Sequence, residues 1–412
     1  MSAASATSVT ATQFKPEDAM LPDGIAKRTR AMGVVALGLG LVLSGIGLFT
    51  DAHRFAFSYL TGFSWMLTIG LGALIFIVIM QLTRTGWSIA ARRQAEWITG
   101  VIPYAILLFI PIIVFSQKFH IWEWMAPEMA NDELLHKKSW WLTPNFFWAR
   151  AAGYFLVWLF LSRYFSAKSR RQDQTGDSRL THDMQKMAAP GVLLMALTLS
   201  AAAFDWIMSL MPHWYSTIFG LYIFSGSIVA ALALIILGTI NFQSQGLYGR
   251  VSTVEHRHDL GKLMFGFTVF WTYIAFSQYF LIWYANIPEE TVFFRARGEG
   301  TWMLVSKLLV LGHFVFPFVV LLPRTTKRHM QILGAMAAWM LFMHFVDLYW
   351  IIMPVHSELG VGVTFANFMV DLGGLALPAG VLVFAISRRA TSEPIFPVRD
   401  PRLAETMRLE QL

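Results

Sequence analysis

The sequence predicts an all-α polytopic membrane protein with about ten transmembrane helices. Of its 412 residues, 56% are hydrophobic and only 14% are charged, whereas a soluble domain carries about 25% charged residues. The apolar residues fall in long runs, and the basic residues fall in alternate connections between those runs. Aromatic residues make up 15% of the chain, which suits rings at membrane interfaces. The net charge is +7. The excess basic residues lie in short connections, which favours a membrane over nucleic acid as the partner.

The length of each apolar run predicts a membrane-spanning helix. A helix needs about 20 residues to cross roughly 30 Å of hydrocarbon. Before the first run the chain is rich in Ser, Ala and Thr and has no apolar core, so we expect a tail there and not a cleaved signal peptide. The predicted spans are 30–49, 59–81, 97–116, 144–165, 188–211, 215–240, 261–284, 301–322, 330–353 and 363–387.

The charges sort the connections into two alternating sets. One set is basic and the other is mixed or acidic, and the positive-inside rule places the basic set in the cytoplasm. Both chain ends adjoin the basic set, so the pattern predicts an even number of spans and cytoplasmic termini. The basic set contains Lys27, Arg28, Arg30, Arg84, Arg92, Arg93, Lys168, Arg170, Arg171, Arg179, Lys186, Arg250, Arg257, Arg324, Lys327, Arg328, Arg388 and Arg389. The other set contains Glu123, Glu128, Asp132, Glu133, Glu289, Glu290, Glu299 and Glu358.

Two motifs repeat within the chain. Residues 115–128 read FSQKFHIWEWMAPE and residues 276–289 read FSQYFLIWYANIPE, with eight identical positions. Asp205 precedes a Met-Pro pair by the same spacing as Asp347 does, and a histidine follows each pair. Each motif recurs four helices later, and an even shift keeps the orientation of the copy. The sequence therefore predicts two four-helix bundles related by a parallel repeat, with one flanking helix on each side.

This repeat divides the chain into six parts. They are a cytoplasmic N-terminal tail (1–28), a flanking helix (29–58), a first four-helix bundle (59–214), a second four-helix bundle (215–353), a last flanking helix (354–387) and a cytoplasmic C-terminal tail (388–412).

Ionisable residues within the predicted spans are the candidate functional residues, because such groups are costly to keep in hydrocarbon. At a rise of about 1.5 Å per residue, all of them except His313 fall in the outer half of the bilayer. The inner half offers mainly hydroxyls and amides, which indicates an outer aqueous half-channel or a site near the outer face. The candidates are Arg150, Asp205, Lys307, His313, His344, Asp347 and Asp371.

His344 and Asp347 are the leading candidate pair for proton transfer. They are three residues apart and share a helix face, and imidazole titrates at a pH of about 6.5. The alternative is a hydrogen-bonded pair that fixes helix packing. Asp205 shares both interpretations as the repeat partner of Asp347. Arg150 and Lys307 are expected to be counter-ions to these carboxylates. Asp371 precedes Gly373, Gly374 and Pro378, a sequence typical of a kinked helix.

The sequence predicts no metal or haem in this chain. It contains no cysteine, which excludes a disulfide, a cysteine-ligated iron–sulfur cluster and a covalently attached haem. A haem held between His313 and His344 is the alternative, and two lone histidines support it weakly. The FSQ segments of the repeat are interpreted as polar packing at helix ends.

Three segments resemble a known family. GKLMFGFTVFWTYIAFSQYFLIWYANIPEET (261–291), AAFDWIMSLMPHWYSTIFGLYIFSG (202–226) and FMHFVDLYWIIMP (342–354) resemble one of the two related ten-helix membrane proteins of alternative complex III, the one without a redox cofactor. It belongs to the NrfD/polysulfide-reductase type of membrane protein. The resemblance extends over nearly the whole chain from the first span onward.

The resemblance implies a component of a quinol-oxidising complex in the bacterial cytoplasmic membrane. The expected partners are the homologous ten-helix membrane protein, an iron–sulfur protein, multihaem and monohaem cytochromes c, small membrane proteins and lipids. Haem c and iron–sulfur clusters are then carried by these partners, and quinol is the substrate of the complex. The member that this chain resembles is not expected to be catalytic on its own and is proposed to conduct protons. The repeat described above is similar to the two four-helix bundles of this family.

Two other functions compete with this interpretation. In the first, the chain itself binds quinone, with Arg150 or a histidine at the quinone headgroup. In the second, the chain is a secondary transporter, because parallel repeats and intramembrane charges also occur in transporters. Transporters usually bind substrate near the midplane, whereas the charges expected here crowd toward the outer face.

Topology is the first testable prediction. Reporter fusions after Glu128 and after Gly298 are expected to report the periplasm, because both positions lie in the connections that are not basic. A cytoplasmic signal at either position would overturn the predicted arrangement.

Overall fold

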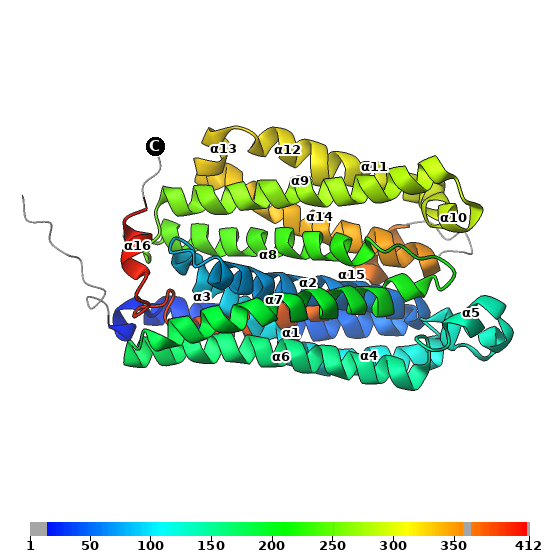
Figure 1. Cartoon of the computed structure of the whole chain (residues 1–412), viewed down its shortest axis with the longest axis horizontal. Helices are drawn as coiled ribbons and strands as arrows, with labels where there is room; N and C mark the ends of the chain where they lie inside the picture. The colour runs from blue at the N-terminus through cyan, green and yellow to red at the C-terminus, as the bar shows by residue number, and fades with distance from the viewer. Residues whose placement is uncertain (1–14, 250, 357–363, 410–412) are drawn as a thin grey trace, which may run out of the picture.

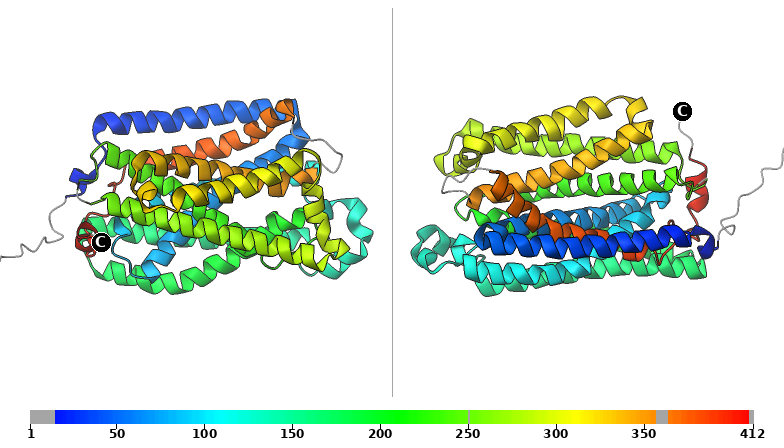
Figure 2. Two further views of the ribbon diagram at one scale, coloured as in Figure 1. Left: turned by 90° about the horizontal axis from the view of Figure 1, so that it is seen from above. Right: turned by 180° about the vertical axis from the view of Figure 1, so that it is seen from behind.

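The computed structural model describes residues 15–249, 251–356 and 364–409, which form a bundle of long helices running side by side (Figures 1 and 2). No strand occurs among these residues, so the predicted all-α class is confirmed. Nine of the described helices are long and apolar enough to cross a membrane, which makes the chain a multi-pass membrane protein by its architecture.

The long elements form the body of the bundle, and the short ones lie at its two ends. The long elements are α1 (Asp23–Thr50), α2 (Ala52–Leu82), α3 (Ile89–Ile98) continued by η2 (Thr99–Val101) and α4 (Ile102–Phe119), α6 (Pro144–Thr175), α7 (Arg179–Trp206), α8 (Phe219–Ser244), α9 (Val254–Ala285), α11 (Gly300–Leu308) continued by the π-helix η6 (Leu309–Val315) and α12 (Phe316–Leu321), α14 (Met330–His356) and α15 (Phe365–Ala390). The short elements are η1 (Pro16–Ala19), η3 (Glu123–Met125), η4 (Pro127–Asn131), α5 (Glu133–Lys138), η5 (Met208–Leu210), α10 (Pro288–Arg297), α13 (Arg324–Arg328) and α16 (Leu403–Met407).

Helix α6 corresponds to the fourth predicted span (144–165), the one predicted span that is not among the nine apolar helices of the described structure. Arg150 and Arg163 interrupt its apolar section and lower its mean hydropathy. Both described ends of the chain nevertheless lie at one end of the bundle (Figure 1), where the Ile395 amide donates to the Ala19 carbonyl at 2.8 Å. An even number of crossings is needed to bring both ends together, so α6 crosses with the other nine.

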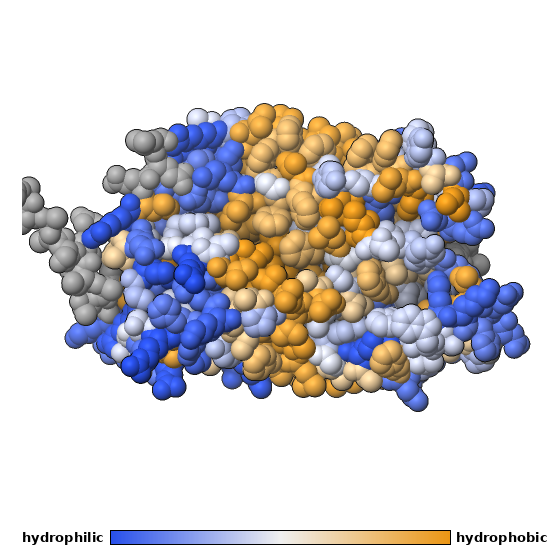
Figure 3. Space-filling model, viewed as in Figure 1, coloured by the Kyte–Doolittle hydropathy of each residue, from blue (hydrophilic) through white to orange (hydrophobic). Residues whose placement is uncertain are grey.

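The two ends of the bundle are distinguished by these elements. We call the end that carries η1 and α16 the terminal end, and the end that carries α5 and α10 the loop end (Figure 1). Hydrophobic residues form a band between the two ends on the face shown in Figure 3, and hydrophilic residues gather at both ends. This distribution is that of a protein whose middle lies in hydrocarbon.

Helices α2, α8 and α14 form the interior. In its most apolar window, α2 has 83% of its residues buried, and α8 and α14 each have 72% buried. The two predicted flanking helices, α1 and α15, pack against each other along their length (Figure 2). The division into two repeated bundles stays a prediction.

Several predicted boundaries are wrong, because the helices are longer than the predicted spans. The span predicted from residue 97 begins at Ile89, the span predicted from residue 59 begins at Ala52, and the span predicted from residue 188 begins at Arg179. Arg54, Arg92 and Arg93 therefore lie in helices and not in connections. Each of these arginines faces a carboxylate, so the helix can continue through a position that hydropathy alone would place outside it.

Some predicted features lie outside the described residues. They are Arg250 and Glu358 of the charge pattern, most of the N-terminal tail (1–14) and residue 363 at the start of the last predicted span.

Glycines allow the helix backbones to approach closely. A Cβ at Gly40 would lie 2.6 Å from the Ala376 carbonyl oxygen, whereas one at Gly38 on the same helix would have no atom within 4 Å. The close approach of α1 and α15 therefore depends on Gly40 and not on Gly38.

The matched pair Gly40→Ala and Gly38→Ala tests this packing. Gly40→Ala is expected to destabilise the protein by about 1–3 kcal/mol, because backbone must move. Gly38→Ala is expected to be neutral or to stabilise by up to about 1 kcal/mol through helix propensity. Thermal unfolding in detergent measures both, and equal transition temperatures for the two variants would contradict the close packing.

Candidate functional site

Four clusters of buried ionisable residues bear on the predicted site. One contains Asp205, one contains Asp371, one contains Asp347 and one contains Glu96. Each of these carboxylates is buried, but the groups that satisfy them differ, and this difference decides what each cluster can do chemically.

Asp205 lies at the last turn of α7 and is held by an arginine from α6. Arg150 donates from Nε to Oδ2 at 2.7 Å and from Nη2 to Oδ1 at 2.9 Å. The Tyr154 hydroxyl donates to Oδ2 at 2.7 Å and the Trp141 indole to Oδ1 at 2.8 Å. The guanidinium also lies 4.1 Å from the centre of the Trp141 ring. A two-point ion pair with neutral donors on both oxygens gives the Asp205 carboxylate a counter-ion and satisfies both of its oxygens.

Asp371 is held in the same manner by an arginine that the sequence did not single out. Arg54 of α2 donates to both carboxylate oxygens, at 2.9 and 2.6 Å. Hydroxyls from Ser58 and Tyr349 donate to the same carboxylate at 2.5 and 2.6 Å. The cluster joins α2, α14 and α15 at the loop end. Arg54 was missed because it precedes the predicted span, although the Asp51 side chain, which caps α2 by accepting from the Arg54 amide, is a helix-start signal.

Asp347 differs because only neutral groups donate to it. The Tyr222 hydroxyl of α8 donates to Oδ1 and the Trp271 indole of α9 donates to Oδ2 at 3.1 Å. The side chain is 2% exposed, and no lysine or arginine pairs with it among the described residues. Its charge is therefore not fixed by a counter-ion.

The two histidines lie beside this carboxylate without bonding to it. The Trp271 ring stacks on His313 with centroids 3.8 Å apart. His344 Nε2 lies 2.8 Å from the Thr68 hydroxyl of α2. Both ring nitrogens of His313 and Nδ1 of His344 are buried without a hydrogen-bond partner in the described part of the chain. Trp271 thus connects Asp347 to His313.

The expected direct pair of His344 and Asp347 is not present. Residues three apart on a helix point about 60° apart around its axis, and here they meet different neighbours. His344 turns to Thr68 of α2, whereas Asp347 turns to α8 and α9. A proton passing between them would need an intervening group.

Lys307 is not the counter-ion that the sequence predicted. Its side chain is exposed, and no carboxylate of the described residues forms an ion pair with it. It faces a cavity on the side of the bundle. Arg150, by contrast, has the predicted geometry of a counter-ion to Asp205.

The π-helix η6 carries His313. Pro317 lies one turn later and has no N–H to donate to the preceding turn, which is a common cause of an irregular helix. The Gly312 carbonyl accepts from the Trp339 indole at 2.7 Å. This irregular segment therefore brings His313 against Trp271, and π-helical turns occur frequently at functional sites.

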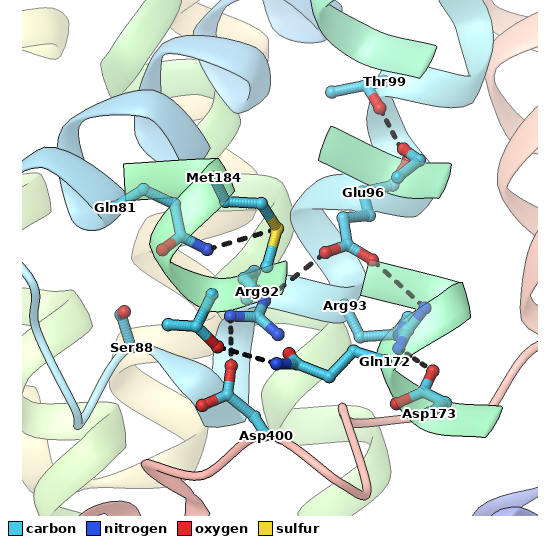
Figure 4. Close-up of polar contacts among 12 residues, drawn as sticks. Gln81, Ser88, Arg92, Arg93, Glu96, Thr99, Gln172, Asp173, Met184 and Asp400 are labelled. Carbon is cyan, nitrogen blue, oxygen red and sulfur yellow. Dashed lines mark hydrogen bonds and ion pairs between the residues drawn. The ribbon is translucent and has the colours of Figure 1, made fainter. Parts of the chain in front are cut away.

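The fourth cluster lies at the terminal end, and the sequence analysis did not single out its residues as candidates. Arg92 and Arg93 of α3 lie beside Glu96 at 3.4 and 3.1 Å (Figure 4). Arg92 also pairs with Asp400 at 2.6 Å, and Arg93 pairs with Asp173 of α6. Since all five side chains are buried, ionisable groups lie toward both ends of the bundle.

The C-terminal segment completes this cluster. Asp400 is fully buried; burial acts to raise the pKa of its carboxyl, but the charges of Arg92 and Arg402 outweigh burial and hold that pKa below its usual range. The Glu393 carboxylate accepts from the Trp97 indole at 3.1 Å and pairs with Arg170 at 2.9 Å. The predicted tail is therefore packed against the bundle. The i, i+3 and i, i+4 spacing of Arg92, Arg93 and Glu96 is the sequence signal that was missed.

Neither a family model nor a curated protein matches this chain. Within the described ranges, no group of three or more His, Asp or Glu side chains is arranged to hold a metal ion. What the chain does must therefore be argued from its buried charges and its motifs.

A double-variant experiment tests the Arg54–Asp371 pair. Arg54→Met is expected to destabilise the protein by about 3–5 kcal/mol, because it leaves a buried carboxylate without its counter-ion. Arg54→Met combined with Asp371→Leu is expected to recover much of that loss, since no charge is left unpaired.

Thermal unfolding in detergent provides the measurement. Lys137→Gln is the control, because Lys137 pairs with Glu133 at 3.2 Å with its side chain 71% exposed, and exposed pairs contribute little. A double variant that is as unstable as the single one would show that the cluster is held by more than charge balance.

Proposed function

We propose that this chain is a membrane component of a quinol-oxidising electron-transfer complex in the bacterial cytoplasmic membrane, where it supplies a proton-conducting path and a scaffold for the cofactor-bearing partners. The resemblance of residues 202–226, 261–291 and 342–354 to alternative complex III supports the placement in that complex. The proposed partners are the homologous membrane protein, an iron–sulfur protein and cytochromes c. In this proposal the chain has no redox cofactor of its own and both termini are cytoplasmic.

The observation that carries the proton-conducting role is the set of groups around Asp347. Asp205 and Asp371 each have an arginine counter-ion that contacts both carboxylate oxygens. Asp347 has only the Tyr222 hydroxyl and the Trp271 indole as donors among the described residues. Desolvation disfavours the ionised form of such a group while hydrogen bonds favour it, so both protonation states are accessible. A group that transfers protons needs this property.

The neighbouring histidines provide further proton acceptors. Neutral His313 and His344 each keep a buried ring nitrogen without a partner in the described structure, and Thr68 continues from His344 into α2. We propose Asp347, His313 and His344 as the central part of the path. Asp205 and Asp371 are then electrostatic supports and not carriers, and Lys307 lies off this part of the path.

Asp347→Asn is the test in the assembled complex. The amide keeps the shape and one acceptor but cannot titrate, so assembly and electron transfer from quinol are expected to be retained. Proton uptake or release coupled to turnover is expected to fall. Proteoliposomes with a pH-sensitive dye measure this, and quinol oxidation is followed in parallel.

Asp205→Asn is the matched control. It breaks a charged pair with Arg150, so it is expected to reduce the stability of the assembled complex. If Asp347→Asn prevents assembly of the complex, Asp347 is a packing residue. If coupled proton movement is unchanged in an assembled Asp347→Asn complex, the path does not pass through this carboxyl.

A further inference from the structure

A large cavity opens on the side of the bundle between α9, the end of α10 and α11 with η6. Its volume is about 1210 Å³, which exceeds the roughly 300–1,000 Å³ of a usual small-molecule site. Figure 1 shows these elements next to one another toward the loop end. Most of the wall is apolar, for example at Val269, Phe276, Leu309 and Phe314. Such a cavity in the hydrophobic band suits one or more hydrocarbon chains.

The polar end of this cavity is lined by Arg295, Arg297 and Lys307, and no Asp or Glu is among the described residues of its wall. Arg295 pairs with the exposed Glu299 at 3.6 Å, so Arg297 and Lys307 are the two lining cations that form no ion pair with a carboxylate of the described residues. All three lie at or near the loop end, in α10 and α11. The lining therefore has the polarity of an amphiphile, with an apolar section along α9 and η6 and a basic section at the loop end.

Arg297 is the decisive residue because it is buried without an acidic partner among the described residues. It is 1% exposed, and its guanidinium lies 3.5 Å from the centre of the Phe293 ring. It donates to the carbonyls of Trp350, Phe293 and Ile351 at 2.9, 2.6 and 2.6 Å. Carbonyl dipoles orient the guanidinium but do not neutralise it. Burial lowers the pKa of Arg297 to about 9, opposed by the nearby Tyr222, so the group is still a cation at neutral pH.

Three other buried arginines, each paired with a carboxylate, show what Arg297 lacks. Arg54 faces Asp371, Arg92 faces Asp400 and Arg150 faces Asp205, whereas Arg297 meets no carboxylate in the part of the chain that the structure describes. Of its five N–H groups, three donate to carbonyls and a fourth approaches the Met211 sulfur at 3.9 Å. One N–H on Nη2 is left, and the exposed Lys307 ammonium can donate from the rim of the cavity.

We propose that this cavity binds an anionic phospholipid, with its phosphate at Arg297 and Lys307 and its acyl chains between α9 and η6. Charge complementarity selects this occupant. A quinone ring is neutral and would leave the Arg297 charge unbalanced, and a free phosphate would leave the apolar section unfilled. The proposal does not rest on the electron-transfer role, because lipid binding is measured without turnover.

The test compares lipids on the protein purified with its partners in mild detergent. Phosphatidylglycerol and phosphatidylcholine are added in turn, and native mass spectrometry measures the bound lipid. The wild type is expected to retain phosphatidylglycerol in preference to phosphatidylcholine. Because one charge-assisted contact contributes about 1.4 kcal/mol or more, Lys307→Gln is expected to weaken phosphatidylglycerol binding roughly tenfold.

The variants separate the phosphate contact from folding. Arg297→Gln is expected to weaken binding more than Lys307→Gln does. If it does not fold, the double variant Arg295→Gln with Lys307→Gln replaces it, since both side chains are exposed. Lys118→Gln is the matched control, because Lys118 is exposed at the same end of the bundle and does not line the cavity.

Three results would overturn the proposal. Equal retention of the two lipids by the wild type would mean that the basic section selects nothing. Unchanged phosphatidylglycerol binding in the Lys307 and Arg297 or Arg295 variants would place the phosphate elsewhere. Co-purification of a quinone, or of a partner helix, in place of phospholipid would assign the cavity to that occupant.

Discussion

A charge can remain inside hydrocarbon only if another group replaces the water it has lost, and this constraint organises the bundle. Arg150 with Asp205 joins two consecutive helices, whereas Arg54 with Asp371 and Arg92 with Asp400 join segments that are 317 and 308 residues apart. Hydrophobic contact cannot select one helix pairing over another in lipid, because lipid tails are as apolar as the helices. The ion pairs, together with close glycine contacts such as that of Gly40 with α15, therefore supply the specificity that apolar side chains lack.

The same constraint separates structural from chemically active carboxylates. A carboxylate that meets an arginine at two points has a fixed charge and stabilises the fold. One that meets a hydroxyl and an indole, as Asp347 does, is held in place without a fixed charge. The bundle thus contains both kinds of site at comparable burial, and the donors, more than the depth, distinguish them.

Hydropathy and charge alternation predicted the fold class and the approximate spans, since both depend on composition along the chain. The pairing of charges could not be predicted in this way. Arg54 and Asp371 are 317 residues apart. Arg54 was assigned to a connection because its low hydropathy excludes it from the apolar run of the predicted span. Helical spacing placed His344 and Asp347 on one side of α14. Their side chains nevertheless point about 60° apart around the helix axis, so they contact different neighbours. The large cavity depends on how α9, α10 and η6 meet, which no local pattern reports.

The fold-back of the C-terminal segment has a consequence for biosynthesis. Arg92 enters the bundle with α3, whereas its partner Asp400 follows 308 residues later. During translation the insertion machinery must accommodate the basic pair of α3 with only the local Glu96 to offset it. The segment around Asp400 leaves the ribosome long after α3 and then supplies the missing carboxylate, so that its arrival completes the charge balance of an early helix. Nascent chains halted before Asp400 would carry that imbalance, with Arg92 beside Glu96 alone.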